Sequence, residues 1–216
     1  MKSNIFFKVI IFCCVFLNHA NCYATSPTKD EAISFANSKG KELLMSFQEP
    51  NIKLRYEKLD NLFLQHLDVD YISKFVVGKY WKIMDHQQRE KYQELFKRYG
   101  LSYYKTLPLD FANNLTYEII NAEVEKDYTN VASVIHVNLN AENPQNVALI
   151  FKLRKANNVI KVVDVKVAES SMLLAYRSKF YEMIAKNEEE IDWFLEDLED
   201  ITRSYELSLQ ENAMQK

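Results

Sequence analysis

The sequence predicts an α+β fold in which helices pack on one face of a four-stranded antiparallel sheet. Apolar residues recur with helical spacing toward both ends of the chain, and four runs rich in β-branched residues lie between them. Short polar segments join these runs. Short connections favour an antiparallel meander, because parallel strands need long crossovers. The sequence has no repeat and no Pro- or Gly-rich linker that would suggest a second domain.

Four helical segments are expected before the strands. They span Thr28–Phe47, Ile52–Leu67, Tyr71–Trp81 and a long segment that begins at Asp85. Asp85 and Gln88 form a capping-box-like start, in which each side chain satisfies a backbone N–H of the other. The long helix then carries a stripe at spacings of four, three, four and four residues, made of Tyr92, Phe96, Tyr99, Tyr103 and Leu107.

The strands are expected at Thr116–Val124, Val131–Leu139, Val147–Arg154 and Val159–Val167. The third strand alternates cleanly, and its apolar face consists of Val147, Leu149, Phe151 and Leu153. In the fourth strand, Val163 and Val165 share a face. Asp164 between them is expected to be an outward-facing carboxylate paired with a neighbouring lysine.

Two helices are expected after the strands. Ser171 can cap the first, whose apolar stripe is Leu173, Tyr176, Phe180 and Ile184. Glu188–Glu190 suit the first turn of the last helix by the sign of the helix dipole. That helix continues through Ile191, Phe194, Leu198, Ile201 and Tyr205.

Residues 1–24 have the pattern of a cleaved signal peptide. Lys2 and Lys8 precede the apolar run Val9–Leu17, and Cys22-Tyr23-Ala24 places small residues at the −3 and −1 positions of a cleavage site. The run is shorter than the ~20 residues that span a bilayer, so a retained anchor is the less favoured alternative. Residues 25–216 are then expected to form a single domain without cysteine, since all three cysteines lie in residues 1–24.

Charge and motifs exclude several classes of function. Loss of Lys2 and Lys8 changes the formal charge from −3 to −5, which suits neither nucleic-acid binding nor permanent attachment to an anionic bilayer. His66, His86 and His136 have no metal-ligand spacing, and no nucleophile or phosphate-loop motif is present. We therefore expect no catalytic residue, no metal and no cofactor. The aromatic stripes predict core packing, or a cavity with tyrosines at its rim.

Two distant segments resemble the MlaC family of periplasmic phospholipid-binding proteins, also called the toluene-tolerance family. Gly78-Lys79-Tyr80-Trp81, followed by Arg89, Phe96 and Tyr103, is similar to the family's G-[RK]-Y-W…R…F…F…Y pattern, with Tyr92 at the first phenylalanine. Val163-Asp164-Val165, Ser171, Tyr176-Arg177 and Phe180 are similar to its D-V…G-V-S-L…N-Y-R…F segment. The family's tryptophan before the D-V pair is absent here, as are its glycines near Glu169 and in the last turn.

The resemblance implies an α+β domain built around an apolar cavity, with bound phospholipid as cargo. Such a protein would shuttle glycerophospholipid in the periplasm between an outer-membrane lipoprotein–porin complex and an inner-membrane ABC transporter complex, and so maintain outer-membrane lipid asymmetry. Apart from the resemblance, partner docking is expected to use charged surface near the pocket mouth, with Lys79, Lys82, Arg89 and Arg177 as candidates. A solvated helix face is the favoured alternative for any one of them. The residues expected to contact lipid are Tyr80, Phe96, Tyr99, Tyr103, Leu149, Phe151, Val163, Val165, Tyr176 and Phe180.

A second hypothesis is a non-lipid periplasmic adaptor whose aromatic stripes form an ordinary packed core. An enzyme on a similar scaffold is a more distant alternative, because a fold does not determine a function. Phospholipid that co-purifies with the protein would separate the first two hypotheses.

Overall fold

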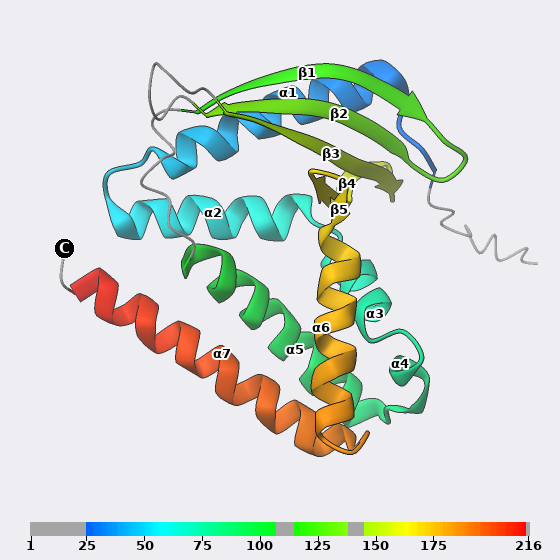
Figure 1. Cartoon of the computed structure of the whole chain (residues 1–216), viewed down its shortest axis with the longest axis vertical. Coiled ribbons are helices and arrows are strands. Elements are labelled where there is room, and N and C mark those ends of the chain that lie inside the picture. The colour runs from blue at the N-terminus through cyan, green and yellow to red at the C-terminus, as the bar shows by residue number, and fades with distance from the viewer. Residues whose placement is uncertain (1–24, 107–114, 138–144, 215–216) are drawn as a thin grey trace, which may run out of the picture.

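A computed structural model describes residues 25–106, 115–137 and 145–214 (Figure 1). The predicted signal peptide, Leu107 and Leu139 lie outside these residues. Five helices and a 3-10 turn precede the sheet: α1 Lys29–Phe47, α2 Ile52–His66, α3 Val69–Val77, α4 Tyr80–Ile83, α5 His86–Tyr103 and η1 Tyr104–Thr106. The strands and last helices are β1 Leu115–Val124, β2 Thr129–Val137, β3 Gln145–Ala156, β4 Val159–Val167, β5 Ser170–Ser171, α6 Met172–Lys186 and α7 Ile191–Met214.

Side-chain caps fix where several helices begin. Asp85 and Gln88 form the predicted capping box of α5, and Thr28 and Glu31 form a second one at α1. Ser171 caps α6 as predicted, by accepting a hydrogen bond from the backbone N–H of Leu174. The predicted segment Tyr71–Trp81 is instead two helices, because Gly78 ends α3 with a positive φ of 49°.

The sheet has five strands in the order β1-β2-β3-β4-β5, all antiparallel, so the prediction of four strands was one too few. The additional strand, β5, is formed by Ser170 and Ser171, which pair with the end of β4. Ala168 and Glu169 make the intervening two-residue turn with φ of 46° and 70°. Neither residue is the Gly or Asn that usually marks such a turn, which is why the sequence did not reveal it.

The pairing register defines one apolar face, here called the inner face. Phe151 lies opposite Val131 on β2 and Val165 on β4, and Leu149 lies opposite Ser133 and Val167. Bulges at Ile120 and Val163 interrupt the ladders. His136 lies on the opposite face, where its ring contacts Asn146 and Glu118.

The helices do not all cover the sheet. Helix α1 packs against β1 and β2, while α5, α6 and α7 form a layer farther from the sheet, joined to it by α6 at β4 (Figure 1). One core cluster contains Ala32, Ala36, Val131, Leu153 and Val162, and a second unites α3 to α7. Helix α1 lies so close to the sheet that a Cβ on Gly40 would be 2.5 Å from the Tyr117 ring.

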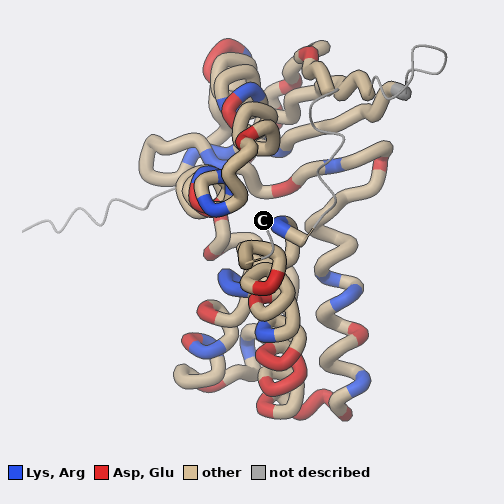
Figure 2. The backbone as a smooth tube through the Cα atoms, turned by 90° about the vertical axis from the view of Figure 1, so that its left-hand side faces the viewer, with Lys and Arg blue, Asp and Glu red and all other residues tan. Residues whose placement is uncertain are grey.

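The turn between α6 and α7 carries acidic residues that were predicted to begin the last helix. Glu188–Glu190 instead precede α7, because Glu188 and Glu189 adopt positive φ of 55° and 63°. Acidic residues gather along the backbone at this end of the molecule, away from the sheet (Figure 2). Among the described residues, no helix is long and apolar enough to cross a membrane.

Candidate functional site

The aromatic stripe of α5 packs mainly against α6 and α7. Phe180 of α6 lies at the centre, with its ring 5.7 Å from Phe96, 5.6 Å from Tyr99 and 6.0 Å from Phe194. Tyr92 completes this core and donates a hydrogen bond from its hydroxyl to the carbonyl oxygen of Ser73 at 2.8 Å. All five residues are buried. Phe96, Tyr99 and Phe180 are therefore part of the helical core itself.

Four tyrosines form the border of this core, and we call them the tyrosine cluster: Tyr99, Tyr103, Tyr176 and Tyr205. The rings of Tyr99 and Tyr103 stack 5.8 Å apart with an interplanar angle of 7°. Tyr176 meets both rings edge-on, at 6.3 and 6.2 Å, and Tyr205 contacts both at 5.9 and 5.6 Å. Tyr99 is buried, whereas the other three side chains are partly exposed. This edge combines ring faces with accessible hydroxyl groups.

Three hydroxyls of the tyrosine cluster, those of Tyr99, Tyr176 and Tyr205, stay protonated at neutral pH. Burial raises the pKa of Tyr99 to about 12, and burial raises the pKa of Tyr176 still further above its ordinary value. The pKa of Tyr205 is also raised, again mainly by burial. These groups can therefore donate hydrogen bonds but do not supply negative charge.

The inner face of the sheet is apolar but incompletely covered. Phe151 packs in the core beneath α1, with its ring 6.3 Å from that of Tyr117. Ile135, Val147 and Val167 lie on the same face and are partly exposed. An apolar sheet face that retains exposure offers a surface on which hydrocarbon can be buried.

The ten predicted lipid-contact residues do not form one cluster. Tyr80, Phe96, Tyr99, Tyr103, Tyr176 and Phe180 belong to the helical cluster. Phe151 and Val165 belong to the sheet cluster, and Leu149 and Val163 are buried outside both. Tyr80 lies at the far end of α6, where its hydroxyl donates to Glu189 Oε1 at 2.6 Å. Its position links α4 to the α6–α7 turn.

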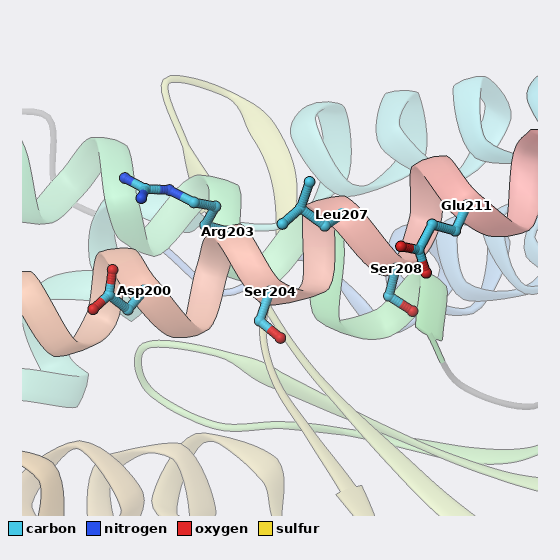
Figure 3. A pocket seen from close by; sticks show the side chains of 6 residues that line it. All are labelled: Asp200, Arg203, Ser204, Leu207, Ser208 and Glu211. Atoms are coloured by element: carbon cyan, nitrogen blue, oxygen red, sulfur yellow. The ribbon is translucent and has the colours of Figure 1, made fainter.

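Two hollows lie on the helices. The first runs along α7 and is lined by Asp200, Arg203, Ser204, Leu207, Ser208 and Glu211 (Figure 3). The second lies between α5 and α7, beside the ion pair of Arg98 with Glu206, whose Nη2 and Oε2 atoms are 2.8 Å apart. Both are open to solvent and lined by helical residues alone. Within the described parts of the chain, no group of three or more His, Cys, Asp or Glu residues could hold a metal ion.

Comparison with protein-family models matches residues 41–200 to the MlaC protein family. The chain belongs to the MlaC family. A solved structure of a phospholipid-binding protein from Ralstonia solanacearum, in complex with a phospholipid, has a similar fold, with a TM-score of 0.63 and 19% sequence identity. The match covers 80% of this chain and 97% of that protein. Comparison with curated proteins gives no significant match.

The two MlaC-like segments of the sequence meet in space. At Gly78, a Cβ would lie 2.5 Å from the Tyr181 hydroxyl and 2.6 Å from Arg177 Nη2, and its φ of 49° is unfavourable for other residues. Arg177 donates to the carbonyl oxygen of Phe75 at 3.3 Å and to the Tyr181 hydroxyl at 3.0 Å. The first segment therefore docks the turn between α3 and α4 onto α6.

Of the four candidate docking cations, the two arginines are engaged inside the fold, whereas Lys79 and Lys82 are exposed. Arg89 donates to the carbonyl oxygens of Trp81 and Lys82 at 3.0 and 3.3 Å, and Arg177 is held as described above. Lys79 pairs with Glu189, with their Nζ and Oε1 atoms 3.4 Å apart, but remains exposed. The guanidinium groups of Arg89 and Arg177 are thus both held by hydrogen bonds within the fold.

Sequence reasoning also missed members of the candidate site. Tyr205 was assigned to the stripe of the last helix, yet it completes the tyrosine cluster. Tyr117 faces Phe151, donates to the carbonyl oxygen of Ala36 at 3.3 Å, and has a pKa raised to about 12 by burial. The alternation of the first strand could have identified Tyr117, since Leu115, Tyr117 and Ile119 share one face.

Proposed function

We propose that this protein is a periplasmic phospholipid carrier. The observation that carries the proposal is the partly exposed apolar inner face of the sheet, with the tyrosine cluster of α5, α6 and α7 as a second apolar surface with polar edges. Membership of the MlaC family and the bound phospholipid in the structurally similar protein support it. No step of the proposal requires a catalytic residue, a metal or a cofactor.

A comparison of acyl-chain burial in the protein and in a bilayer favours reversible lipid transport over permanent binding. Burial of two acyl chains with ~30 methylenes at ~0.8 kcal/mol each stabilises the lipid by more than ~20 kcal/mol relative to water. A bilayer provides about the same stabilisation, so a protein with a similar interior exchanges lipid with it at little net cost. Acyl burial also does not depend on the head group, so these contacts alone would accept several head groups.

The proposed contacts follow from the two surfaces. Leu149, Phe151 and Val165 would contact acyl chains from the sheet, and Tyr103 and Tyr176 would contact them from the helices. Phe96, Tyr99 and Phe180 would support the tyrosines from beneath, since they are buried. Val163 and Tyr80 would contribute indirectly, by stabilising the fold. Val163 lies at the β4 bulge, and Tyr80 contacts the α6–α7 turn.

The cellular role would be transport between membranes. We propose that residues 1–24 are a cleaved signal peptide and that residues 25–216 form one domain in the periplasm. The partners would be an outer-membrane lipoprotein–porin complex and an inner-membrane ABC transporter complex, and the outcome would be lipid asymmetry of the outer membrane. Native mass spectrometry of periplasmic protein should then find a chain beginning at Thr25 with phospholipid bound.

Photo-crosslinking on β3 tests the carrier proposal. A crosslinking amino acid at Leu149 or Phe151 on the inner face should capture phospholipid, whereas the same group at Ala148 or Ile150 on the opposite face should not. These neighbouring positions are matched controls, because successive side chains of a strand point to opposite faces.

The adaptor hypothesis makes the contrary prediction for the same experiment. A folded protein that captures no phospholipid from either inner-face position would have an ordinary packed core. That result would contradict the carrier proposal. Circular dichroism of each variant confirms that the sheet is intact before the crosslinks are compared.

A further inference from the structure

Lys179 lies against the tyrosine cluster. Its Nζ donates a hydrogen bond to the Tyr99 hydroxyl at 2.7 Å and lies 5.2 and 5.4 Å from the ring centres of Tyr99 and Tyr103. It is also close enough to Tyr205 to favour the ionised form of that phenol. A half-buried ammonium group thus lies among three tyrosines of the cluster.

This ammonium group has no carboxylate partner among the described residues. The phenols of Tyr99 and Tyr205 do not replace one, because burial raises the pKa of both above its ordinary value and keeps them neutral at physiological pH. An ammonium has three N–H donors, and the structure gives one of them to Tyr99. Two donors therefore remain for an anion.

The hydroxyls nearby add further donors. Tyr99 accepts from Lys179, so its own O–H is free to donate. The hydroxyls of Tyr103, Tyr176 and Tyr205 have no hydrogen-bond partner among residues 25–106, 115–137 and 145–214, and none is sealed away from solvent. A cation surrounded by neutral O–H donors matches the oxygens of a phosphate group.

We propose that Lys179 and the hydroxyls of the tyrosine cluster bind the phosphate of a phospholipid head group. The proposal rests on the proposed carrier function and specifies the polar end of that site. Helix α6 leaves the sheet at Met172, so Lys179 lies about 10 Å along the helix from the sheet. This arrangement would hold the phosphate at the tyrosine cluster while the acyl chains extend toward the inner face.

The test compares two lipids with identical acyl chains, phosphatidylglycerol and diacylglycerol, which lacks the phosphate. Wild-type protein should bind phosphatidylglycerol more tightly. Lys179→Met should weaken binding of phosphatidylglycerol by about tenfold and leave diacylglycerol binding unchanged, because it removes only a charge-assisted contact. Lys179→Arg, which keeps the charge, should restore most of the preference for phosphatidylglycerol.

Lys186→Met is the matched control, since it removes the same charge from the same helix two turns away, where Lys186 pairs with Asp197. It should bind both lipids as wild type does. An unchanged preference for phosphatidylglycerol in a folded Lys179→Met protein would overturn the proposal. If wild type binds neither lipid, the carrier function itself fails, so the two failures are distinguishable.

Glycerol 3-phosphate separates a head-group site from a free-phosphate site. Calorimetry should detect weak binding to wild type and none to Lys179→Met. If glycerol 3-phosphate requires Lys179 but the choice between the two lipids does not, Lys179 binds free phosphate and the head-group assignment is wrong.

Discussion

His66 carries the one buried side-chain nitrogen or oxygen without a hydrogen-bond partner in the described part of the chain, its Nε2. The ring packs edge-on against Phe35, with ring centres 5.6 Å apart. Burial lowers the pKa of His66, and the nearby Lys39 and Lys161 lower it further, while Glu42 opposes them. The folded protein therefore favours neutral histidine.

This shift predicts a pH-dependent stability. The unfolded chain takes up a proton on His66 near pH 6.5, whereas the folded chain resists it, so the free energy of unfolding should fall as the pH drops below about 6.5. Urea denaturation between pH 7.5 and 5 should show a smaller loss for His66→Gln than for wild type. The exposed His86 provides the control, and His86→Gln should follow wild type. Identical profiles for all three proteins would contradict the assignment.

Among the secondary-structure elements, the junction of β4 and α6 depends on Asp164. The sequence suggested an outward-facing carboxylate paired with lysine, which was wrong. Asp164 is 8% exposed and accepts hydrogen bonds from Ser171 Oγ at 2.6 Å and from the backbone N–H of Leu173 at 2.9 Å. It thereby satisfies a free N–H of the first turn of α6 and holds the capping serine.

Replacement of this carboxylate should loosen α6. Asp164→Ala should lower the free energy of unfolding by about 1–3 kcal/mol, because a buried hydrogen-bond donor loses its partner. Asp127→Ala, in the exposed turn between β1 and β2, should change it by less than about 0.5 kcal/mol. Equal effects of the two substitutions in chemical denaturation would show that Asp164 does not stabilise the junction.

Local sequence signals predicted most elements to within a few residues. The capping box at Asp85 and the β-branched run Val159–Val167 define elements that begin where expected. The roles of Asp164 and of the Ala168-Glu169 turn could not be read in the same way. Both depend on the turn that brings β5 back to pair with β4. The sequence of that turn contains no Gly or Asn, the residues that usually identify such a turn.

At the scale of the whole molecule, periodicity identified buried faces but not their neighbours. The helices were expected to pack on one face of the sheet, yet the stripe of α5 packs against α6 and α7. A spacing of three and four residues shows which side of a helix is apolar and carries no information about what covers it. For the same reason, the predicted lipid contacts are spread over two clusters, with Leu149 and Val163 buried outside both. The family signature supplied the long-range information that periodicity lacks. Its two segments include Gly78 and Arg177, which lie 99 residues apart in the sequence and meet in the structure.

Under the proposed carrier function, the partly exposed inner face should make the stability of the whole domain depend on bound phospholipid. A ligand that binds only the folded state adds a free energy that grows with the ratio of its concentration to its dissociation constant, about 4 kcal/mol at a thousandfold ratio. In a domain of this size, each kcal/mol shifts the melting temperature by about 2–4 °C. Detergent delipidation should therefore lower the melting temperature by several degrees, and added phospholipid should restore it.

Val147→Gln, on the inner face, should reduce this lipid-dependent shift because it places an amide against hydrocarbon, while Ala148→Gln on the opposite face should preserve it. A melting temperature that is the same with and without phospholipid would mean that no acyl chain is buried against this sheet.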